Sequence, residues 1–228
     1  MSGVVFIPDR NSHGKKDMTG AFRPEARKFI KYWQREHEDE FDLVSINVGR
    51  SRKKQEQQVL DAIKAAADSY GALDTVAFFC HGFHHKLQFG FPLLADGPDK
   101  LAKVIAENSA NTITVPLYCC STAGTNSKKP DEVASGDGGF ADMLRDSLCR
   151  HGALENRTMG HTNSGHTTRN PHVRLFDGNG MPEGGTGGYW VVSPGGPLWK
   201  KWARILRTEY RFLFPYLDVK DIWKDLTE

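Results

Sequence analysis

The sequence contains little cysteine, no long apolar run and almost no excess charge. Four cysteines in 228 residues, two of them adjacent, are a poor basis for a disulfide framework, which favours reduced thiols and a cytoplasmic protein. No apolar run approaches the roughly 18 residues of a membrane span, and no signal-peptide pattern precedes the strand-like segment that begins at Gly3. The 30 basic residues are interspersed with 28 acidic ones, so we expect no nucleic-acid or membrane surface.

Neither an internal repeat nor a change of composition divides the chain. A length of 228 residues is sufficient for one large domain with a substantial core. We therefore expect a single domain over residues 1–228, with its core at about 3–195 and C-terminal helices over 196–228.

Strand-like and helical patterns alternate along the first two thirds of the chain. Apolar residues at helical spacing follow the strand-like runs, as in Ala26, Phe29, Ile30 and Trp33 after an opening Pro24. Such alternation predicts right-handed crossovers and a mostly parallel sheet, hence an α/β fold. The predicted strands are 3–8, 41–49, 73–80, 112–120, 155–162 and 189–193; the predicted helices start at Pro24 and cover about 53–70, 98–110, 138–152 and 196–214, with a short helical tail, while 164–188 is irregular.

Pro116 conflicts with its place inside the fourth predicted strand. Proline lacks the N–H that a strand donates to its neighbour, so it is normally found at sheet edges, strand starts or bulges. Either the strand pairs from Leu117 onward, or it carries a bulge at the proline.

Two of the strand-like runs end on reactive side chains. VAFFCHG reaches His81 and Gly82, and TITVPLYCC reaches Cys119 and Cys120. Ligands bind beyond the carboxyl ends of parallel strands, and neighbouring strands lie about 4.8 Å apart. An imidazole and a thiol on adjacent strands would therefore meet at one rim, where a histidine favours the nucleophilic thiolate and protonates a leaving amine. Gly82 has no Cβ, so a substrate carbonyl can approach the main-chain N–H groups there.

The segments FFCHGF and LYCCSTAG, whose second cysteine lies 39 positions after the histidine, resemble the His-Gly and Cys blocks of the caspase-like cysteine peptidases. The order of elements over roughly residues 3–195 is similar too, and its later part is closest to the CHAT and metacaspase branches. The resemblance implies a three-layer sandwich whose mostly parallel, six-stranded sheet has the order 2-1-3-4-5-6, with helices on both faces. It also implies a cysteine endopeptidase that cleaves protein or peptide substrates through a Cys-His dyad and needs no cofactor.

Only one of the two adjacent cysteines can face the histidine, because side chains alternate along a strand. In the family blocks a small residue precedes the nucleophile, which aligns Cys119 with that residue and Cys120 with the nucleophile. Cys120 is also nearer the polar loop, where a thiolate is more accessible. We therefore predict Cys120 as the nucleophile, His81 as the proton shuttle, and the N–H groups of Gly82 and Cys120 as the oxyanion hole.

Substrate specificity does not follow from the resemblance. Tyr118 and Cys119 precede the predicted nucleophile and match neither the metacaspase nor the caspase pattern at these positions. Asp9, just after the first strand, is a candidate acidic partner for a basic substrate residue, and the segment after the fifth strand supplies two histidines on the same rim. The predicted substrate-binding residues are thus Asp9, Tyr118, His161 and His166.

Two other functions remain open. A catalytically silent caspase-like module would only bind partner proteins. A metallohydrolase would use His161, His166 and His172, although their spacing matches no common zinc motif, so no metal site is predicted. The polar loop 121–138 contains Lys128 and Lys129, where we expect self-processing if the enzyme accepts basic residues.

Overall fold

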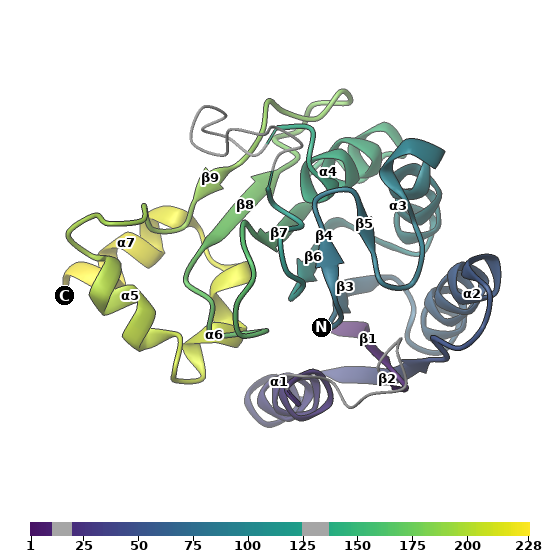
Figure 1. Cartoon of the computed structure of the whole chain (residues 1–228), viewed down its shortest axis with the longest axis horizontal. Helices are drawn as coiled ribbons and strands as arrows, with labels where there is room; N and C mark the ends of the chain where they lie inside the picture. The colour runs from purple at the N-terminus through teal and green to yellow at the C-terminus, as the bar shows by residue number, and fades with distance from the viewer. Residues whose placement is uncertain (11–19, 125–136) are drawn as a thin grey trace.

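The computed structural model describes residues 1–10, 20–124 and 137–228. Its centre is a seven-stranded sheet in the order β2-β1-β3-β6-β7-β8-β9 (Figure 1). Strands β2 to β7 in that order pair in parallel, whereas β8 and β9 are added antiparallel. A separate hairpin consists of β4 (Gly82–Phe83) and β5 (Lys86–Leu87). The strands of the large sheet are β1 (Ser2–Pro8), β2 (Glu40–Ile46), β3 (Leu73–Phe78), β6 (Ser109–Leu117), β7 (Arg157–His161), β8 (Val173–Asp177) and β9 (Tyr189–Trp190).

The predicted strand order is confirmed. When the hairpin is left aside and the strands are numbered along the chain, the sheet reads 2-1-3-4-5-6, and β9 adds a short seventh strand beyond β8. The α/β class and the mostly parallel pairing are therefore those expected from the resemblance to the caspase-like fold.

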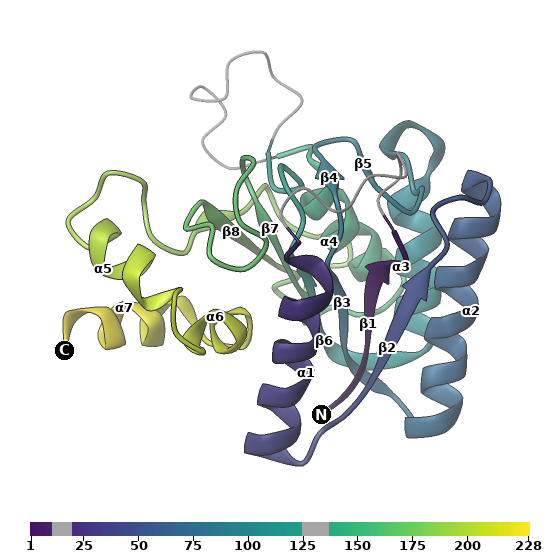
Figure 2. The ribbon, with the colours of Figure 1, turned by 60° about the horizontal axis from the view of Figure 1, so that its bottom comes forward.

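Helices cover both faces of the sheet, as a three-layer sandwich requires. Figures 1 and 2 place α2 and α3 on one side of the sheet and α1 with the three C-terminal helices on the other. Two buried apolar clusters match these layers, one containing residues of α2, α3 and α4, the other residues of α1, α5, α6 and α7. The helices are α1 (Phe22–His37), α2 (Arg52–Tyr70), α3 (Gly97–Glu107), α4 (Phe140–Arg150), α5 (Trp199–Ile205), α6 (Tyr210–Leu213) and α7 (Val219–Thr227), with 3₁₀ turns η1 (Leu93–Ala95) and η2 (Phe214–Tyr216).

The predicted sixth strand was placed wrongly. Residues 189–193 give only the two-residue β9, while the sixth long strand is β8, inside the segment expected to be irregular. Four consecutive residues of β8, from Val173 to Phe176, are buried and pair with β7. Arg174 interrupts the apolar run in the sequence, but its guanidinium lies 4.2 Å above the ring of Trp190. A charged side chain can be buried in this way when an aromatic face receives it.

The predicted long C-terminal helix is broken into two. Helix α5 ends at Ile205, and α6 begins at Tyr210. Between them, the Thr208 hydroxyl donates to the Ile205 carbonyl (2.6 Å) and accepts the Tyr210 N–H (3.3 Å). Because this hydroxyl replaces backbone partners, it favours a turn over a continuous helix.

Pro116 lies within a paired strand, contrary to both alternatives considered from the sequence. Strand β6 is already in register with β7 from Thr114 onward, and Pro116 is opposite Met159. The irregularity of β6 lies further upstream, where its register with β3 shifts between Leu73 and Thr75. Along the described residues, no helix is both long and apolar enough to cross a lipid bilayer.

Candidate active site

The ends of β3 and β6 bring His81 and Cys120 to equivalent positions. The two strands are parallel neighbours, and Phe78 is the register partner of Leu117. His81 lies three residues after Phe78, and Cys120 lies three residues after Leu117. The register continues beyond the strands, because the Sγ atoms of Cys80 and Cys119, two residues after the pair, lie 3.4 Å apart.

The alternation of side chains places His81 and Cys120 on the same side of the sheet. Phe79 and Tyr118 belong to the apolar cluster under α1, whereas Cys80 and Cys119 belong to the cluster on the opposite face. One residue further, the chain returns to the α1 side. The His81 ring packs there edge-on against Phe22 of α1, with ring centroids 4.9 Å apart.

Gly82 lies in direct contact with the cysteine segment. A Cβ at this position would lie 2.6 Å from Cys119 Cβ, 2.7 Å from the Cys120 carbonyl oxygen and 2.8 Å from Thr122 Cγ2. Distances this short are excluded by van der Waals repulsion, and two of the three atoms cannot move without the backbone. Only glycine therefore permits the two segments to approach so closely.

The hairpin β4–β5 orients the backbone on either side of Gly82. The Gln88 side chain accepts the His81 N–H (3.0 Å), and the Gln88 N–H donates to the His81 carbonyl (3.0 Å). The next pair of the antiparallel ladder is Gly82 with Leu87, and because bonded and non-bonded pairs alternate, this pair is a non-hydrogen-bonded one. The Gly82 N–H therefore points away from β5.

The chain turns sharply directly after Cys120. Ser121 has a φ of 58°, in the left-handed region that non-glycine residues seldom adopt. Three hydrogen bonds hold the turn: Ser121 N–H to the Asn163 carbonyl (3.3 Å), Ala123 N–H to the His161 carbonyl (3.0 Å) and the Thr122 hydroxyl to the Cys119 carbonyl (3.2 Å). Strained backbone of this kind occurs often at functional sites, where the surrounding structure stabilises it.

Cys120 is the most accessible of the four cysteines. Cys80, Cys119 and Cys149 are buried, whereas Cys120 is half-buried, with its Sγ 3.9 Å from the Gly165 carbonyl. Burial raises the pKa of Cys119 well above its ordinary value, and the nearby Cys80 raises it further. Burial also raises the pKa of Cys149. A protonated, inaccessible thiol is a poor nucleophile.

Tyr118 is not at the surface where a substrate would bind. Its side chain is fully buried beneath α1, stacks on Phe79 with a centroid distance of 4.6 Å, and donates its hydroxyl to the Arg211 carbonyl (2.9 Å). Burial raises its pKa well above the ordinary value. The substrate-binding role predicted for this side chain thus has no support in the structure. Tyr118 points to the same side of the sheet as Cys120, but it lies two residues further from the edge, where Phe29 of α1 and Arg211 of α6 cover it.

Asp9 lies at the same edge of the sheet as His81. Phe6 of β1 is in register with Phe78, and Asp9 follows Phe6 by three residues, as His81 follows Phe78. Asp9 is exposed, but its carboxylate accepts the N–H of Val48, a residue just past the end of β2. The Asp9 carboxylate is therefore hydrogen-bonded to the segment that follows β2.

The two predicted histidines, His161 at the end of β7 and His166 on the β7–β8 connection, differ in accessibility. His161 is buried and its Nε2 contacts the Thr167 carbonyl (2.8 Å); burial lowers its pKa to about 4. His166 is half-buried, and burial lowers its pKa as well. In the part of the chain that the structure describes, no three His, Cys, Asp or Glu side chains are grouped to hold a metal ion, and His161, His166 and His172 form no such group.

The sequence interpretation missed a buried ionic cluster around Glu25 of α1, which is 3% exposed. Its carboxylate accepts hydrogen bonds from Thr168 Oγ1 (2.6 Å), Arg211 Nε (3.1 Å) and Lys28 Nζ (2.9 Å). Burial alone would raise the pKa of Glu25, but these donors outweigh it and lower the pKa to about 2. The cluster thereby ties the β7–β8 connection, which borders Cys120, to the helix that packs on His81.

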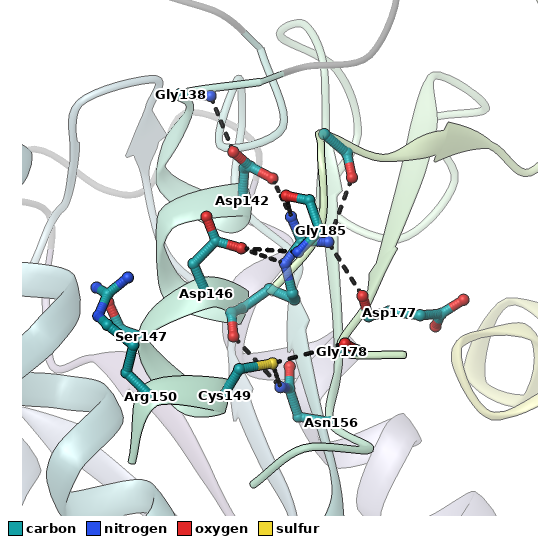
Figure 3. A network of polar contacts seen from close by, with 12 residues as sticks. Gly138, Asp142, Asp146, Ser147, Cys149, Arg150, Asn156, Asp177, Gly178 and Gly185 are labelled. Atoms are coloured by element: carbon teal, nitrogen blue, oxygen red, sulfur yellow. Dashed lines mark hydrogen bonds and ion pairs between the residues drawn. The ribbon is translucent and has the colours of Figure 1, made fainter. Parts of the chain in front are cut away.

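A second buried network surrounds Arg145 of α4, which is 1% exposed (Figure 3). Its guanidinium donates to the carboxylates of Asp142 and Asp146, each at 2.6 Å. Asp142 also accepts the Gly138 N–H (2.9 Å), at the end of the loop that follows the cysteines. The remaining donors hold the β8–β9 connection through the carbonyls of Asp177, Gly185 and Gly187.

No protein-family model matches the chain, and no curated protein matches its sequence. Among solved structures, the fold is similar to the X-ray structure of a secreted C11 cysteine protease from Bacteroides thetaiotaomicron in complex with an irreversible peptide inhibitor. The match has a TM-score of 0.39 and 12% sequence identity, and it covers 75% of this chain and 52% of that one. The chain thus spans about half the length of that protease, and the likeness concerns the fold alone.

Proposed function

We propose that the protein is a cysteine peptidase in which Cys120 is the nucleophile and His81 the general base and acid. The observation that carries the proposal is the equivalent placement of the two residues. Phe78 of β3 and Leu117 of β6 are opposite each other on adjacent parallel strands. His81 lies three residues after Phe78, Cys120 lies three residues after Leu117, and the two are on the same side of the sheet. Ligands bind at this carboxyl edge in open α/β sheets.

The reaction proceeds in two halves. His81 takes the thiol proton of Cys120, and the sulfur forms a bond to the scissile carbonyl carbon, giving a tetrahedral oxyanion. The C–N bond then breaks, and His81 delivers the proton to the leaving amine. Water, deprotonated by His81, releases the acyl group from Cys120 and restores the thiol. No cofactor enters these steps.

The oxyanion is stabilised by the N–H groups of Gly82 and Cys120. Gly82 suits this role because its N–H points away from the hairpin and because its missing Cβ lets its backbone lie directly against the cysteine segment. Loss of one such donor typically costs about 100- to 1000-fold in kcat. The strained turn at Ser121 holds the Cys120 N–H in a fixed orientation.

Substrate recognition is assigned to the connections around this edge. Asp9 and His166 are the predicted substrate-binding residues that remain accessible, and a peptide lying along the edge between β1 and β7 would pass both. Asp9 would select a basic residue once its carboxylate turns from Val48 to the substrate.

Covalent labelling tests the nucleophile without knowledge of the substrate. The folded protein is treated with a small excess of iodoacetamide, and the modified cysteine is identified by peptide mass. We expect Cys120 to react first, and His81→Ala to slow the reaction, since the imidazole favours the thiolate. Labelling of Cys120 no faster than in the denatured protein would instead indicate a silent module that only binds partners.

Peptidase activity is tested on a mixture of peptides of random sequence, in which new N-termini report cleavage. Cys120→Ala should abolish cleavage, whereas Cys119→Ala, which removes a buried thiol from the same turn, should retain it. The assignment is wrong if the two variants show the reverse pattern while both remain folded. Cleavage that depends on added zinc and survives Cys120→Ala would favour the metallohydrolase.

Self-processing is a further test of the same site. Lys128 and Lys129 lie outside the described residues, and the loop that contains them follows Cys120 directly. We expect intact mass to show slow cleavage after one of these lysines in the wild-type protein and none in Cys120→Ala. Full-length protein in both samples after prolonged incubation would contradict this prediction.

A further inference from the structure

A cavity separate from the candidate active site lies between α1 and the segment that includes the α5–α6 turn and α6. Its volume is about 380 Å³, within the range of small-molecule pockets. Figure 2 shows α6 beside α1, and the two helices contact through Phe29 and Phe212, whose ring centroids are 5.9 Å apart. The cavity is lined by Lys28, Lys31, Tyr32, Arg35, Arg207, Thr208, Glu209, Arg211 and Phe212.

The lining is strongly cationic. Five lysine and arginine side chains face one lining carboxylate, that of Glu209. Two further carboxylates pair with lining residues from outside, Glu25 with Lys28 and Arg211, and Glu36 with Arg35. Even when all three carboxylates are counted, positive charge remains in excess by two. A concave surface lined by charges of one sign concentrates ions of the opposite sign, here anions.

Three of the cationic groups retain donors for a ligand. Lys31 and Arg207 are exposed and form no ion pair with any described residue. The Arg211 side chain is only 7% exposed; its Nε donates to Glu25 and its Nη1 to the Thr208 carbonyl, while Nη2 donates to no group in the described chain. A buried guanidinium held by two bonds is a preorganised donor, because little side-chain entropy remains to be lost on binding.

The aromatic residues form an apolar wall beside these charges. The Tyr32 and Phe212 rings have centroids 6.0 Å apart. The Arg211 guanidinium lies 4.3 Å from the Phe212 ring centroid, and that of Arg35 lies 6.0 Å from the Tyr32 centroid. A ligand with both an anionic and a carbon part can therefore contact cations and rings together.

We propose that this cavity binds a small molecule carrying two or more phosphate groups. Guanidinium groups match phosphate oxygens in a planar, two-point geometry, and three of the five cations are arginines. The free donors belong to three side chains on two segments, Lys31 on one and Arg207 and Arg211 on the other, so the cavity can bind more than one anionic group. A cavity of this volume suits a compact molecule better than an extended acidic peptide. The site does not involve His81 or Cys120, and the inference is independent of peptidase activity.

Calorimetric titration of the full-length protein with tripolyphosphate, at constant ionic strength, tests the proposal. We expect saturable binding of one tripolyphosphate per chain, and no saturable binding of sulfate at the same ionic strength. The double variant Lys31→Met and Arg207→Met should weaken tripolyphosphate binding at least about tenfold, since it removes two charge-assisted contacts. Both residues are exposed, so the fold should be retained.

A matched double variant, Lys64→Met and Lys103→Met, removes two exposed cations from α2 and α3 on the opposite face. It should bind tripolyphosphate as the wild type does. Equal weakening in both double variants would show a general effect of net charge and overturn the proposal. Absence of saturable binding, or tighter binding of a hexa-aspartate peptide than of tripolyphosphate, would overturn it as well.

Discussion

The Glu25 cluster predicts a pH-dependent contribution to stability that a single substitution removes. Glu25→Gln keeps the shape of the side chain but removes the charge that accepts hydrogen bonds from Thr168, Arg211 and Lys28. The two cations then lose their buried partner, and an amide N–H₂ replaces one acceptor. Breaking a buried ion pair by removing one partner typically costs about 3–5 kcal/mol.

The magnitude also follows from the pKa. The pKa of Glu25 falls from 4.5 to about 2 on folding, and one pKa unit corresponds to about 1.36 kcal/mol, so the charged form contributes on the order of 3 kcal/mol. In a chain of 228 residues this corresponds to a decrease in Tm of roughly 6–12 °C. Because the folded pKa lies below the unfolded one, the contribution is complete above about pH 4.5 and is lost as the pH falls towards 2.

Urea denaturation at pH 7, 5 and 3 measures the effect, with Glu36→Gln as the control. Glu36 is on the same helix and pairs with Arg35 at 2.5 Å, but both side chains are about half exposed, so its loss should cost at most about 1 kcal/mol. His161, whose pKa is lowered to about 4, destabilises every variant equally as the pH falls below 6.5, and the comparison with wild type at each pH removes this effect. The reasoning would be refuted if the two variants lost equal free energy of unfolding, or if the loss caused by Glu25→Gln were as large at pH 3 as at pH 7.

Two further substitutions address the buried geometry. Arg145→Met should lower the free energy of unfolding by about 3–5 kcal/mol, because it leaves the buried carboxylate of Asp142 without its partner. Arg150→Met, which removes an exposed cation from the next turn of α4, should lower it by less than about 1 kcal/mol, and comparable urea midpoints for the two variants would contradict this prediction. Gly82→Ala should destabilise the fold by about 1–3 kcal/mol and slow Cys120 labelling by about 100-fold, because the new Cβ displaces the cysteine turn. Gly196→Ala, far from the site, is the control. If Cys120 were labelled equally fast in the two variants, a glycine at position 82 would not be needed for the close contact between its segment and the cysteine segment.

The α/β alternation and the mostly parallel pairing were predictable because their information is local, whereas the strand order was implied by the resemblance to the caspase-like peptidases. The crossover rules act on each strand–helix–strand unit, and the apolar stripe of α1 and the stop of α2 at Gly71, with its φ of 83°, are both visible in the sequence. Strand β8 was not predictable, because Arg174 breaks its apolar pattern and the Trp190 ring that receives the guanidinium belongs to another strand. A pattern read along one strand has no information about its neighbour.

The ionic cluster behind the site has a weaker sequence signal. Glu25 lies four residues before Phe29 and three after Phe22, on the buried stripe of α1, which indicates a buried partner. Thr168 is 143 residues away and Arg211 is 186 residues away. Only the tertiary fold brings them together, since no local rule connects a helix near the start of the chain with a loop and a helix near its end.

The choice between the adjacent cysteines depends on both kinds of information. Strand alternation requires that Cys119 and Cys120 face opposite sides, which the sequence alone establishes. Which side faces the histidine depends on register, and the 3.4 Å contact between the Cys80 and Cys119 sulfurs fixes that register across β3 and β6. Since Cys119 meets the residue before His81, Cys120 must share the rim with His81 itself. A shift of one residue in either strand would pair His81 with the buried thiol instead, so the irregularity of β6 has to lie upstream of Thr114, where the structure has it.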